Sequence, residues 1–429
     1  MRANRWGLVT LLALTATVSY LCRVNVSVAG ALMMRDLGIS PIEMGRVFSA
    51  LILGYGLFQV PAGMMADRWG ARKMLLFAGL GWTIATVLMA ATGWGPLSGA
   101  IASSLWVLIF LRFTLGVAQA PTYPAAAQGV AQWIPLHRQG LANSIVLTSV
   151  GLGSGLAPPF LSSIMVRWGW RFAMLASAIP ALLVAAAWAL VREDSTRAPA
   201  RSTPSSTVTD RGRMRSRSFV FLVASYTLEG YVGYVFIFWF YLYLVQERHF
   251  DLLKAGKLSS LPWILCVISI PLGGIVSDRL VTGRLGLRWG RRAVPIFGLA
   301  LAGVFVSLGA RTQNAYTAAV CLALATALTF CVEGPFWTAM MEVAGSNTGT
   351  AGGVMNFGAN FGGFISPALT PILAAHWGWK NALYVAAAIS VVGAGLWLGV
   401  TPRCDGDALG ALPLPLEQVG DGFISSNPA

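Results

Sequence analysis

The sequence is poor in charged residues, which make up only 11% of its 429 residues, against about 25% in soluble domains. With 56% hydrophobic residues, this composition excludes an ordinary soluble protein and indicates a membrane protein. Cysteine and histidine are also scarce. The five cysteines form no C-x-x-C pair, and the three histidines stand apart in expected loops, so we expect neither a metal site nor a cofactor. No Walker A, G-x-S-x-G or HExxH motif is present, which argues against ATP-driven transport and against an enzyme.

What the sequence does contain is a series of long apolar stretches. Twelve of them have roughly the 20 residues that a helix needs to cross a bilayer. They cover residues 7–33, 42–66, 73–93, 99–131, 138–164, 170–191, 217–246, 256–279, 292–311, 315–343, 348–374 and 378–400. The first stretch is too long for a signal peptide and contains Arg23, so we interpret it as a membrane helix. The sequence therefore predicts an all-α membrane protein with twelve transmembrane helices.

The net charge of +14 is distributed over alternate loops and does not form an aromatic-interleaved patch of the kind that binds nucleic acid. Basic residues precede the first span and follow the second, fourth, sixth and eighth. By the positive-inside rule, both termini are expected in the cytoplasm. We expect a monomeric, multi-pass protein of the inner membrane, in contact with lipid and with no nucleic-acid partner.

The chain is expected to consist of two similar halves. Residues 193–216 are polar and rich in Ser, Pro and Arg, which predicts a cytoplasmic linker between six-helix halves at 1–192 and 217–401. Residues 402–429 are polar with several Pro and Gly, which predicts a disordered cytoplasmic tail. Three landmarks recur at nearly one spacing of 209 to 211 residues, namely Asp67 and Asp278, Trp168 and Trp377, and Pro158 and Pro367. Such a parallel duplication is typical of transporters whose substrate site lies between two halves.

A charged motif follows the second span and recurs after the eighth. Residues 63–73 read GMMADRWGARK, and Asp278 and Arg279 begin the second copy. Carboxylates and cations at helix ends can form a network that holds one face of a transporter shut. We therefore interpret Asp67, Arg68, Arg72, Asp278 and Arg279 as a conformational gate, the alternative being a solvated charged turn.

Two arginines lie inside apolar spans. Arg23 interrupts the first span and Arg112 the fourth. A charge at bilayer depth costs roughly 2.5–3.5 kcal/mol on insertion scales, so such residues normally face a water-filled cavity or a partner. A guanidinium suits a carboxylate because its planar fork donates two parallel hydrogen bonds. The pair predicts one cavity that receives an anion; the alternative is that each arginine is structural.

Further polar residues are spaced to reach the same cavity. Tyr20 lies one turn before Arg23, and Gln119 lies two turns after Arg112. Asn356 and Asn360 share a helix face, where they contact either substrate hydroxyls or neighbouring helices.

Two carboxylates lie inside spans of the second half, Glu229 and Glu333. Facing an arginine across the cavity, each would be ionised while the site is empty. An anionic substrate would then compete for the arginine and favour protonation of the acid, which links the binding of substrate and proton. We interpret both as candidate proton-coupling residues. The alternative is that they form internal ion pairs or bond the backbone.

Over residues 7–400 the chain resembles the major facilitator superfamily, and within it the anion:cation symporter family of sialin, the vesicular glutamate transporters and bacterial sugar-acid transporters. The resemblance rests on YLCRVNVSVAG (20–30), LRFTLGVAQAPTYPAAAQGVAQWIP (111–135), APPFLSSIMVRWGWRF (157–172), WFYLYLVQER (239–248) and GGVMNFGANFGGFISP (352–367). It implies that Arg23 and Arg112 bind the substrate carboxylate. It also implies substrate contacts from Tyr20, Tyr55, Trp337 and Asn356.

The chain departs from the family where proton coupling is concerned. Relatives usually carry an acid before the first of these arginines and another seven residues after the second, where this chain has Cys22 and Gln119. We therefore expect a secondary transporter of a small organic anion such as a sugar acid, working by rocker-switch alternating access with proton symport. One alternative is an exchanger or efflux transporter that is not coupled to protons. Another is a membrane sensor or scaffold that binds a ligand without moving it.

Overall fold

A computed structural model describes residues 5–93, 105–191, 215–345 and 348–402, and within these ranges all regular structure is helical. The all-α prediction is therefore confirmed for this part of the chain. The N-terminal group of helices comprises α1 (Arg5–Leu37), α2 (Pro41–Trp69), α3 (Ala71–Ala91), α4 (Leu105–Gln119), α5 (Thr122–Trp133) and α6 (Leu136–Leu190). The C-terminal group comprises α8 (Arg217–Gln246), α9 (Leu252–Thr282), α10 (Gly286–Arg311), α11 (Ala315–Phe330), α12 (Glu333–Ala344), α13 (Thr348–Leu396) and the 3₁₀ turn η3 (Trp397–Gly399). The expected linker (193–216) and tail (402–429) lie almost wholly outside the described residues.

Ten helices of the described residues are long and apolar enough to cross a membrane. Two of them, α6 with 55 residues and α13 with 49, are far longer than one crossing requires. Each contains two helices that meet at a kink, where Gly169 (φ 82°) and Gly378 (φ 81°) adopt a backbone conformation that glycine tolerates best. The kinks are 209 residues apart, which is the spacing of the sequence repeat.

Two predicted spans are interrupted. The stretch predicted at 99–131 is divided into α4 and α5, and the stretch at 315–343 into α11 and α12. The first break contains Pro121, which has no backbone N–H to continue a helix. The second break makes Glu333 the first residue of α12. The interruptions place helix ends, with their partial charges, in the middle of the fold.

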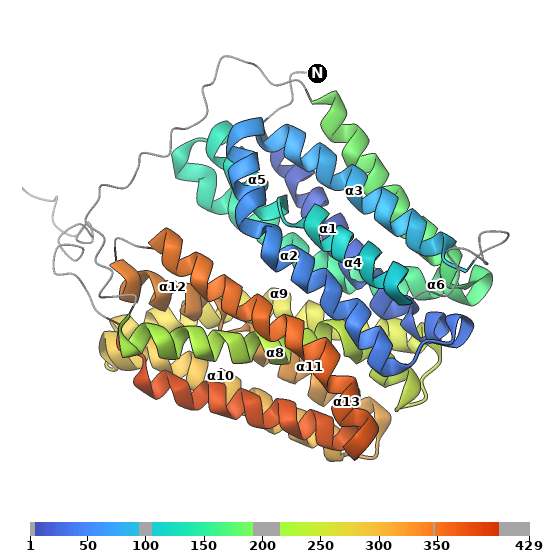
Figure 1. Ribbon diagram of the computed structural model, residues 1–429. Coiled ribbons are helices and arrows are strands. Elements are labelled where there is room, and N and C mark those ends of the chain that lie inside the picture. The colour runs from blue at the N-terminus through green and yellow to red at the C-terminus, as the bar shows by residue number, and fades with distance from the viewer. Residues whose placement is uncertain (1–4, 94–104, 192–214, 346–347, 403–429) are drawn as a thin grey trace, which may run out of the picture.

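The two groups of helices converge at one end and diverge toward the other (Figure 1). They meet where α1 ends and α2 begins, which we call the closed end. There Ser49 Oγ donates to the Phe364 carbonyl at 2.7 Å, and the rings of Phe48 and Phe238 stack with centroids 5.0 Å apart. Ser27 Oγ also donates to the Phe238 carbonyl, at 2.5 Å. Away from this end, further hydrogen bonds between the groups run from Ser260 Oγ on α9 to the Gly155 carbonyl on α6 and from Asn356 Nδ2 to Gln59 Oε1 at 2.8 Å.

The close packing of α2 against α4 depends on glycine. A methyl group on Gly116 would overlap the Leu51 carbonyl, and one on Gly54 would overlap the Phe113 carbonyl. Small residues at such positions let helix backbones approach closely. The contact matters for the site because Tyr55 and Arg112 lie on these two helices.

Replacing Gly116 with Val is expected to destabilise the protein by about 1–3 kcal/mol, because the added methyl groups force two backbones apart. The measurement is the thermal unfolding midpoint of the purified protein in detergent. Gly395→Val is the matched control, since nothing lies within 4 Å of a methyl group at Gly395. An unfolding midpoint unchanged in Gly116→Val would contradict the packing described here.

Candidate substrate-binding site

A cavity of about 140 Å³ lies between the two groups of helices. Helices of the N-terminal group contribute Tyr20, Arg23 and Tyr55. The C-terminal group contributes the opposite wall, made of Tyr226, Glu229, Gly230, Gly233, Tyr234, Ile237, Phe330, Glu333, Asn356, Ala359 and Asn360. The structure thus brings together seven of the ten residues expected to bind substrate or couple protons. It leaves Arg112, Gln119 and Trp337 outside the cavity lining.

Arg23 presents its guanidinium to this cavity from the middle of α1. The side chain is 2% exposed and lies against two aromatic rings, with Cζ 4.7 Å from the ring centroid of Tyr20 and 4.5 Å from that of Tyr55. Its Nε donates to Gln119 Oε1 at 3.0 Å, whereas Nη2 has no hydrogen-bond partner among the described residues. No described ion pair neutralises it. A buried cation in this condition is poised to bind an anion.

Arg112 does not face the same cavity, contrary to the expectation that both guanidiniums converge there. It is fully buried and its Nη2 donates to the Arg23 backbone carbonyl at 3.0 Å. The backbone of α1 therefore lies between Arg112 and the cavity. Its Nε and Nη1 lack partners among the described residues. In this conformation Arg112 contacts α1 on the side away from the cavity and does not line the site.

Gln119 and Trp337 also differ from their expected roles as lining residues. Gln119 accepts from Arg23 Nε and donates to the Ser19 carbonyl at 2.8 Å. An amide can make both bonds because it carries an acceptor and a donor, so Gln119 orients Arg23 without neutralising it. Trp337 is 37% exposed and packs edge-on against Tyr226, which itself lines the cavity.

The opposite wall carries the two carboxylates. Glu229, on α8, is 3% exposed, and its Oε1 has no hydrogen-bond partner among the described residues. Glu333 accepts a hydrogen bond from the Tyr226 hydroxyl at 2.9 Å. As the first residue of α12, Glu333 also lies at the positive end of a helix dipole, which stabilises a negative charge. The site therefore has one cationic wall and one wall with two acids.

Amide and hydroxyl groups complete the lining. Asn356 Nδ2 donates to Gln59 Oε1 of the other helix group, and Asn360 Nδ2 donates to the Asn356 carbonyl at 2.9 Å. The Tyr234 hydroxyl lies 3.5 Å from Asn360 Oδ1. These groups can donate to or accept from the hydroxyls of a bound solute.

Sequence reasoning did not assign Tyr226, Tyr234, Phe330 or Gln59 to the site. Aromatic residues are so frequent in α8 that their number does not identify the ones that face inward. The spacing of Tyr226, Glu229, Gly233 and Tyr234 along one helix face could have done so, once Glu229 was taken as the inward residue.

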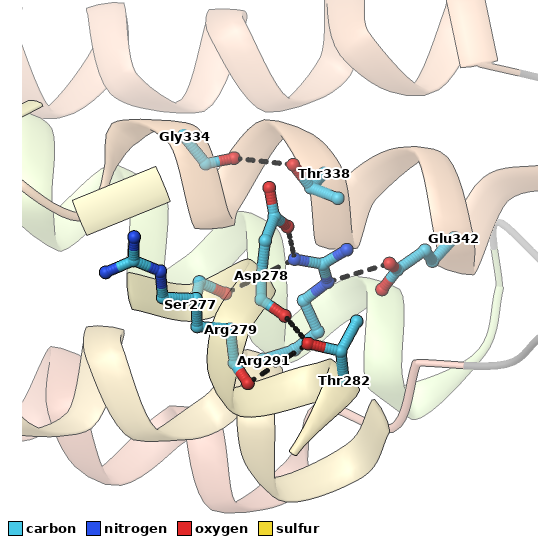
Figure 2. Close-up of polar contacts among 8 residues, drawn as sticks. All are labelled: Ser277, Asp278, Arg279, Thr282, Arg291, Gly334, Thr338 and Glu342. Carbon is cyan, nitrogen blue, oxygen red and sulfur yellow. Dashed lines mark hydrogen bonds and ion pairs between the residues drawn. The ribbon is translucent and has the colours of Figure 1, made fainter. Parts of the chain in front are cut away.

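The predicted gate residues of the C-terminal group form part of a charge network, with a different arginine at its centre. Arg291 on α10 contacts Asp278 Oδ1 at 2.5 Å and Glu342 Oε1 at 2.8 Å. Figure 2 shows the Arg291 guanidinium between the two carboxylates, while the Arg279 side chain points away from them. The network therefore ties the ends of α9, α10 and α12 together, and the Arg279 side chain lies outside it in this conformation.

The corresponding residues of the N-terminal group are arranged differently. Arg72 donates to the carbonyls of Trp188 and Ala189, at 3.1 and 2.8 Å, and so ties α3 to the end of α6. Asp67 and Arg68 are exposed. Between described residues, no ion pair joins the two groups of helices at this end, so a gate across the groups is not formed in this conformation.

Comparison with known proteins agrees with this architecture. The Probable sulfoacetate transporter SauU of Cupriavidus necator is 30% identical over 366 residues, which cover 82% of this chain and 83% of that protein. The Hexuronate transporter of Bacillus subtilis is 25% identical over 402 residues, or 90% of this chain and 92% of that protein. The fold is shared with an inward-facing, unoccupied bacterial homolog of the human lysosomal transporter Spinster, at a TM-score of 0.78 and 17% identity, over 92% of this chain and 97% of that one.

Family membership follows from the extent of the match. Residues 12–285 and 279–416 match the Major Facilitator Superfamily, which is more than half of the chain. The match accords with the membrane-length helices and with the repeated kinks at Gly169 and Gly378. The chain is therefore a multi-pass integral membrane protein and not an enzyme, and it belongs to the Major Facilitator Superfamily.

Proposed function

We propose that this protein is a secondary active transporter of a small organic anion, such as a sugar acid, which it binds at Arg23. The observation that carries the proposal is the buried Arg23 guanidinium, which lines a cavity between the helix groups with Nη2 unpaired. The relatives support the same class of solute, since they are named as transporters of sulfoacetate, hexuronate and D-galactonate. Binding would use the outer N–H groups of the fork, because Nε is held by Gln119.

The proposed topology has twelve membrane crossings in two six-helix halves, with the kinks at Gly169 and Gly378 counted as turns between crossings. By the positive-inside rule, both termini would then be cytoplasmic. The membrane would be the inner membrane of the cell. The closed end would face away from the cytoplasm, so the described conformation would be inward-facing. Rocking of the two halves about the cavity would expose the site to each side in turn.

Coupling to protons is proposed to use Glu229, assisted by Glu333. Glu333 is stabilised as an anion by Tyr226 and by the α12 dipole, whereas the unpaired Oε1 of Glu229 has no such support. An anion bound to Arg23 neutralises the positive charge in the cavity. Protonation of an acid on the opposite wall then becomes more favourable. Binding of the substrate then raises the affinity for the proton, and the reverse also holds, as symport requires.

A second candidate function is anion exchange or efflux without protons. It is favoured by Gln119, which lies beside Arg23 where relatives usually carry an acid that titrates. In this case Glu229 and Glu333 would contribute to substrate binding and would not carry a proton.

Transport in proteoliposomes distinguishes these functions. A thermal-shift screen of small carboxylates and sulfonates first identifies a ligand, because binding to the folded state raises its stability. Labelled ligand is then followed in counterflow without a pH gradient and in accumulation with an acidic exterior. We expect both activities in the wild type. Binding without counterflow would instead favour the sensor or scaffold alternative.

Glu229→Gln is expected to abolish gradient-driven accumulation while leaving counterflow, because the amide keeps the shape of the acid but cannot carry the proton. Glu333→Gln is measured alongside it. Glu247→Gln is the matched control, at the exposed end of the same helix. Accumulation that remains gradient-dependent in both cavity variants would exclude these acids as the coupling groups. Equal accumulation with and without a gradient in the wild type would favour exchange.

A further inference from the structure

We propose that the cavity selects solutes with a single anionic group, and that Glu229 with Glu333 excludes solutes that carry a second one. This inference rests on the proposed function, because it concerns the solute held at Arg23.

The charge of the cavity lining supports only one anionic group. Arg23 is the one cation among the described lining residues. The nearby Arg112 is not available to a second anion, since it lies behind α1 and bonds the Arg23 carbonyl. Histidine and lysine are absent from the described lining. A solute with an anionic group at each end would therefore find a counter-charge for one end only.

The wall opposite Arg23 would repel a second anionic group. Glu229 lines the cavity and is 3% exposed, and its Oε1 has no hydrogen-bond partner among the described residues, so any charge that it carries is poorly screened by water. Glu333 is held beside it by the Tyr226 hydroxyl, and α12 begins at this residue. Uptake of one proton by Glu229 would still leave Glu333 negative. While Glu333 is ionised, a carboxylate placed here would meet like charge, which is a repulsive element of specificity.

The same wall suits a donor of hydrogen bonds. The unpaired Oε1 of Glu229 can accept from a solute hydroxyl, and Asn360 Oδ1 and the Tyr234 hydroxyl lie nearby. The solute that fits both walls carries a carboxylate or sulfonate at one end and a hydroxyl-bearing carbon at the other. Satisfying the buried Glu229 oxygen in this way removes the penalty of an unpaired polar group.

This chemistry separates the relatives into two kinds. Hexuronate and galactonate carry one anionic group, whereas sulfoacetate, galactarate and glucarate carry two. With its single guanidinium and two acids, the cavity of this chain would suit the solutes of the first kind, although the sulfoacetate transporter is 30% identical to this chain.

The test uses pairs of ligands that differ only in a terminal group, hydroxymethyl in one and carboxylate in the other. The pairs are gluconate and glucarate, galactonate and galactarate, and isethionate and sulfoacetate. Affinities of the purified full-length protein are measured by thermal shift and by isothermal titration at one pH and ionic strength.

In at least one pair we expect the monoanion to bind at least tenfold more tightly than its dianionic partner. Dianions that bind as tightly as monoanions, or more tightly, would overturn the inference while leaving anion transport intact. If no member of any pair binds, the proposed function itself fails.

The variants identify the residues responsible. Glu229→Gln and Glu333→Gln, singly and together, are expected to bring the preference for the monoanion below threefold, mainly through tighter binding of the dianion. Glu247→Gln is expected to keep the wild-type preference, because that residue is exposed beyond the cavity. A preference that survives the double substitution would show that the two acids do not set it.

Discussion

Arg23→Lys is expected to weaken substrate binding by roughly 30-fold or more, with a corresponding rise in the half-saturating concentration for transport. Losing a buried, charge-assisted fork costs about 2 kcal/mol or more, and each 1.4 kcal/mol is a factor of about ten in affinity. A lysine keeps the charge but cannot bond Gln119 and a carboxylate in one plane. It also loses the stacking of a planar group on the rings of Tyr20 and Tyr55. The measurement is ligand titration of the purified variant, followed by counterflow.

Two comparisons make this result specific. Arg35→Lys serves as the control, because Arg35 is on the same helix with a side chain that is 75% exposed. Arg112→Lys tests the neighbouring cation, which the structure places behind α1. A larger loss of affinity in Arg112→Lys than in Arg23→Lys would mean that Arg112 is the principal carboxylate ligand, and that the described conformation is not the one that binds substrate.

Gly45→Trp is expected to prevent closure at the closed end and to reduce transport at least about fivefold. A side chain at Gly45 would overlap the Pro367 carbonyl and press on Pro371, both in the other helix group. Overpacking of this kind costs about 1–3 kcal/mol, which is enough to shift the balance between two conformations roughly 5- to 150-fold. Because the clash disappears when the groups separate here, the variant should favour the conformation open at this end.

Accessibility of a single introduced cysteine reports this shift. Ser49 is 3% exposed and donates to the Phe364 carbonyl, so Ser49→Cys should react slowly with a membrane-impermeant thiol reagent added from outside. In the Gly45→Trp background it should react at least about fivefold faster. The same protein without Ser49→Cys corrects for the native thiols, and Gly7→Trp is the control because nothing lies within 4 Å of a methyl group there. Unchanged reactivity together with normal transport would contradict the assignment of this end as a moving contact between the groups.

Local patterns in the sequence were sufficient to predict that the fold is built of membrane-length helices. Apolar runs of membrane length predict helices because the backbone must satisfy its own hydrogen bonds in lipid. The repeat predicted from Asp67, Trp168 and Pro158 reappears in the paired kinks at Gly169 and Gly378. The breaks before α5 and α12 were not predicted, because short interruptions leave the apolar character of the stretch unchanged.

The sequence by itself determined which residues are anomalous, namely Arg23, Arg112, Glu229 and Glu333, because a charge in an apolar run is costly wherever the helix lies. It could not determine which way each one points. Helical spacing places residues on a common face, but the neighbours of that face belong to helices far away in the chain. Only the tertiary structure decided that Arg23 lines the cavity while Arg112 lies behind α1, and that Arg291 takes the place expected for Arg279. It also decided that the two acids share one wall opposite a single guanidinium, since that arrangement depends on packing between α1, α8 and α12.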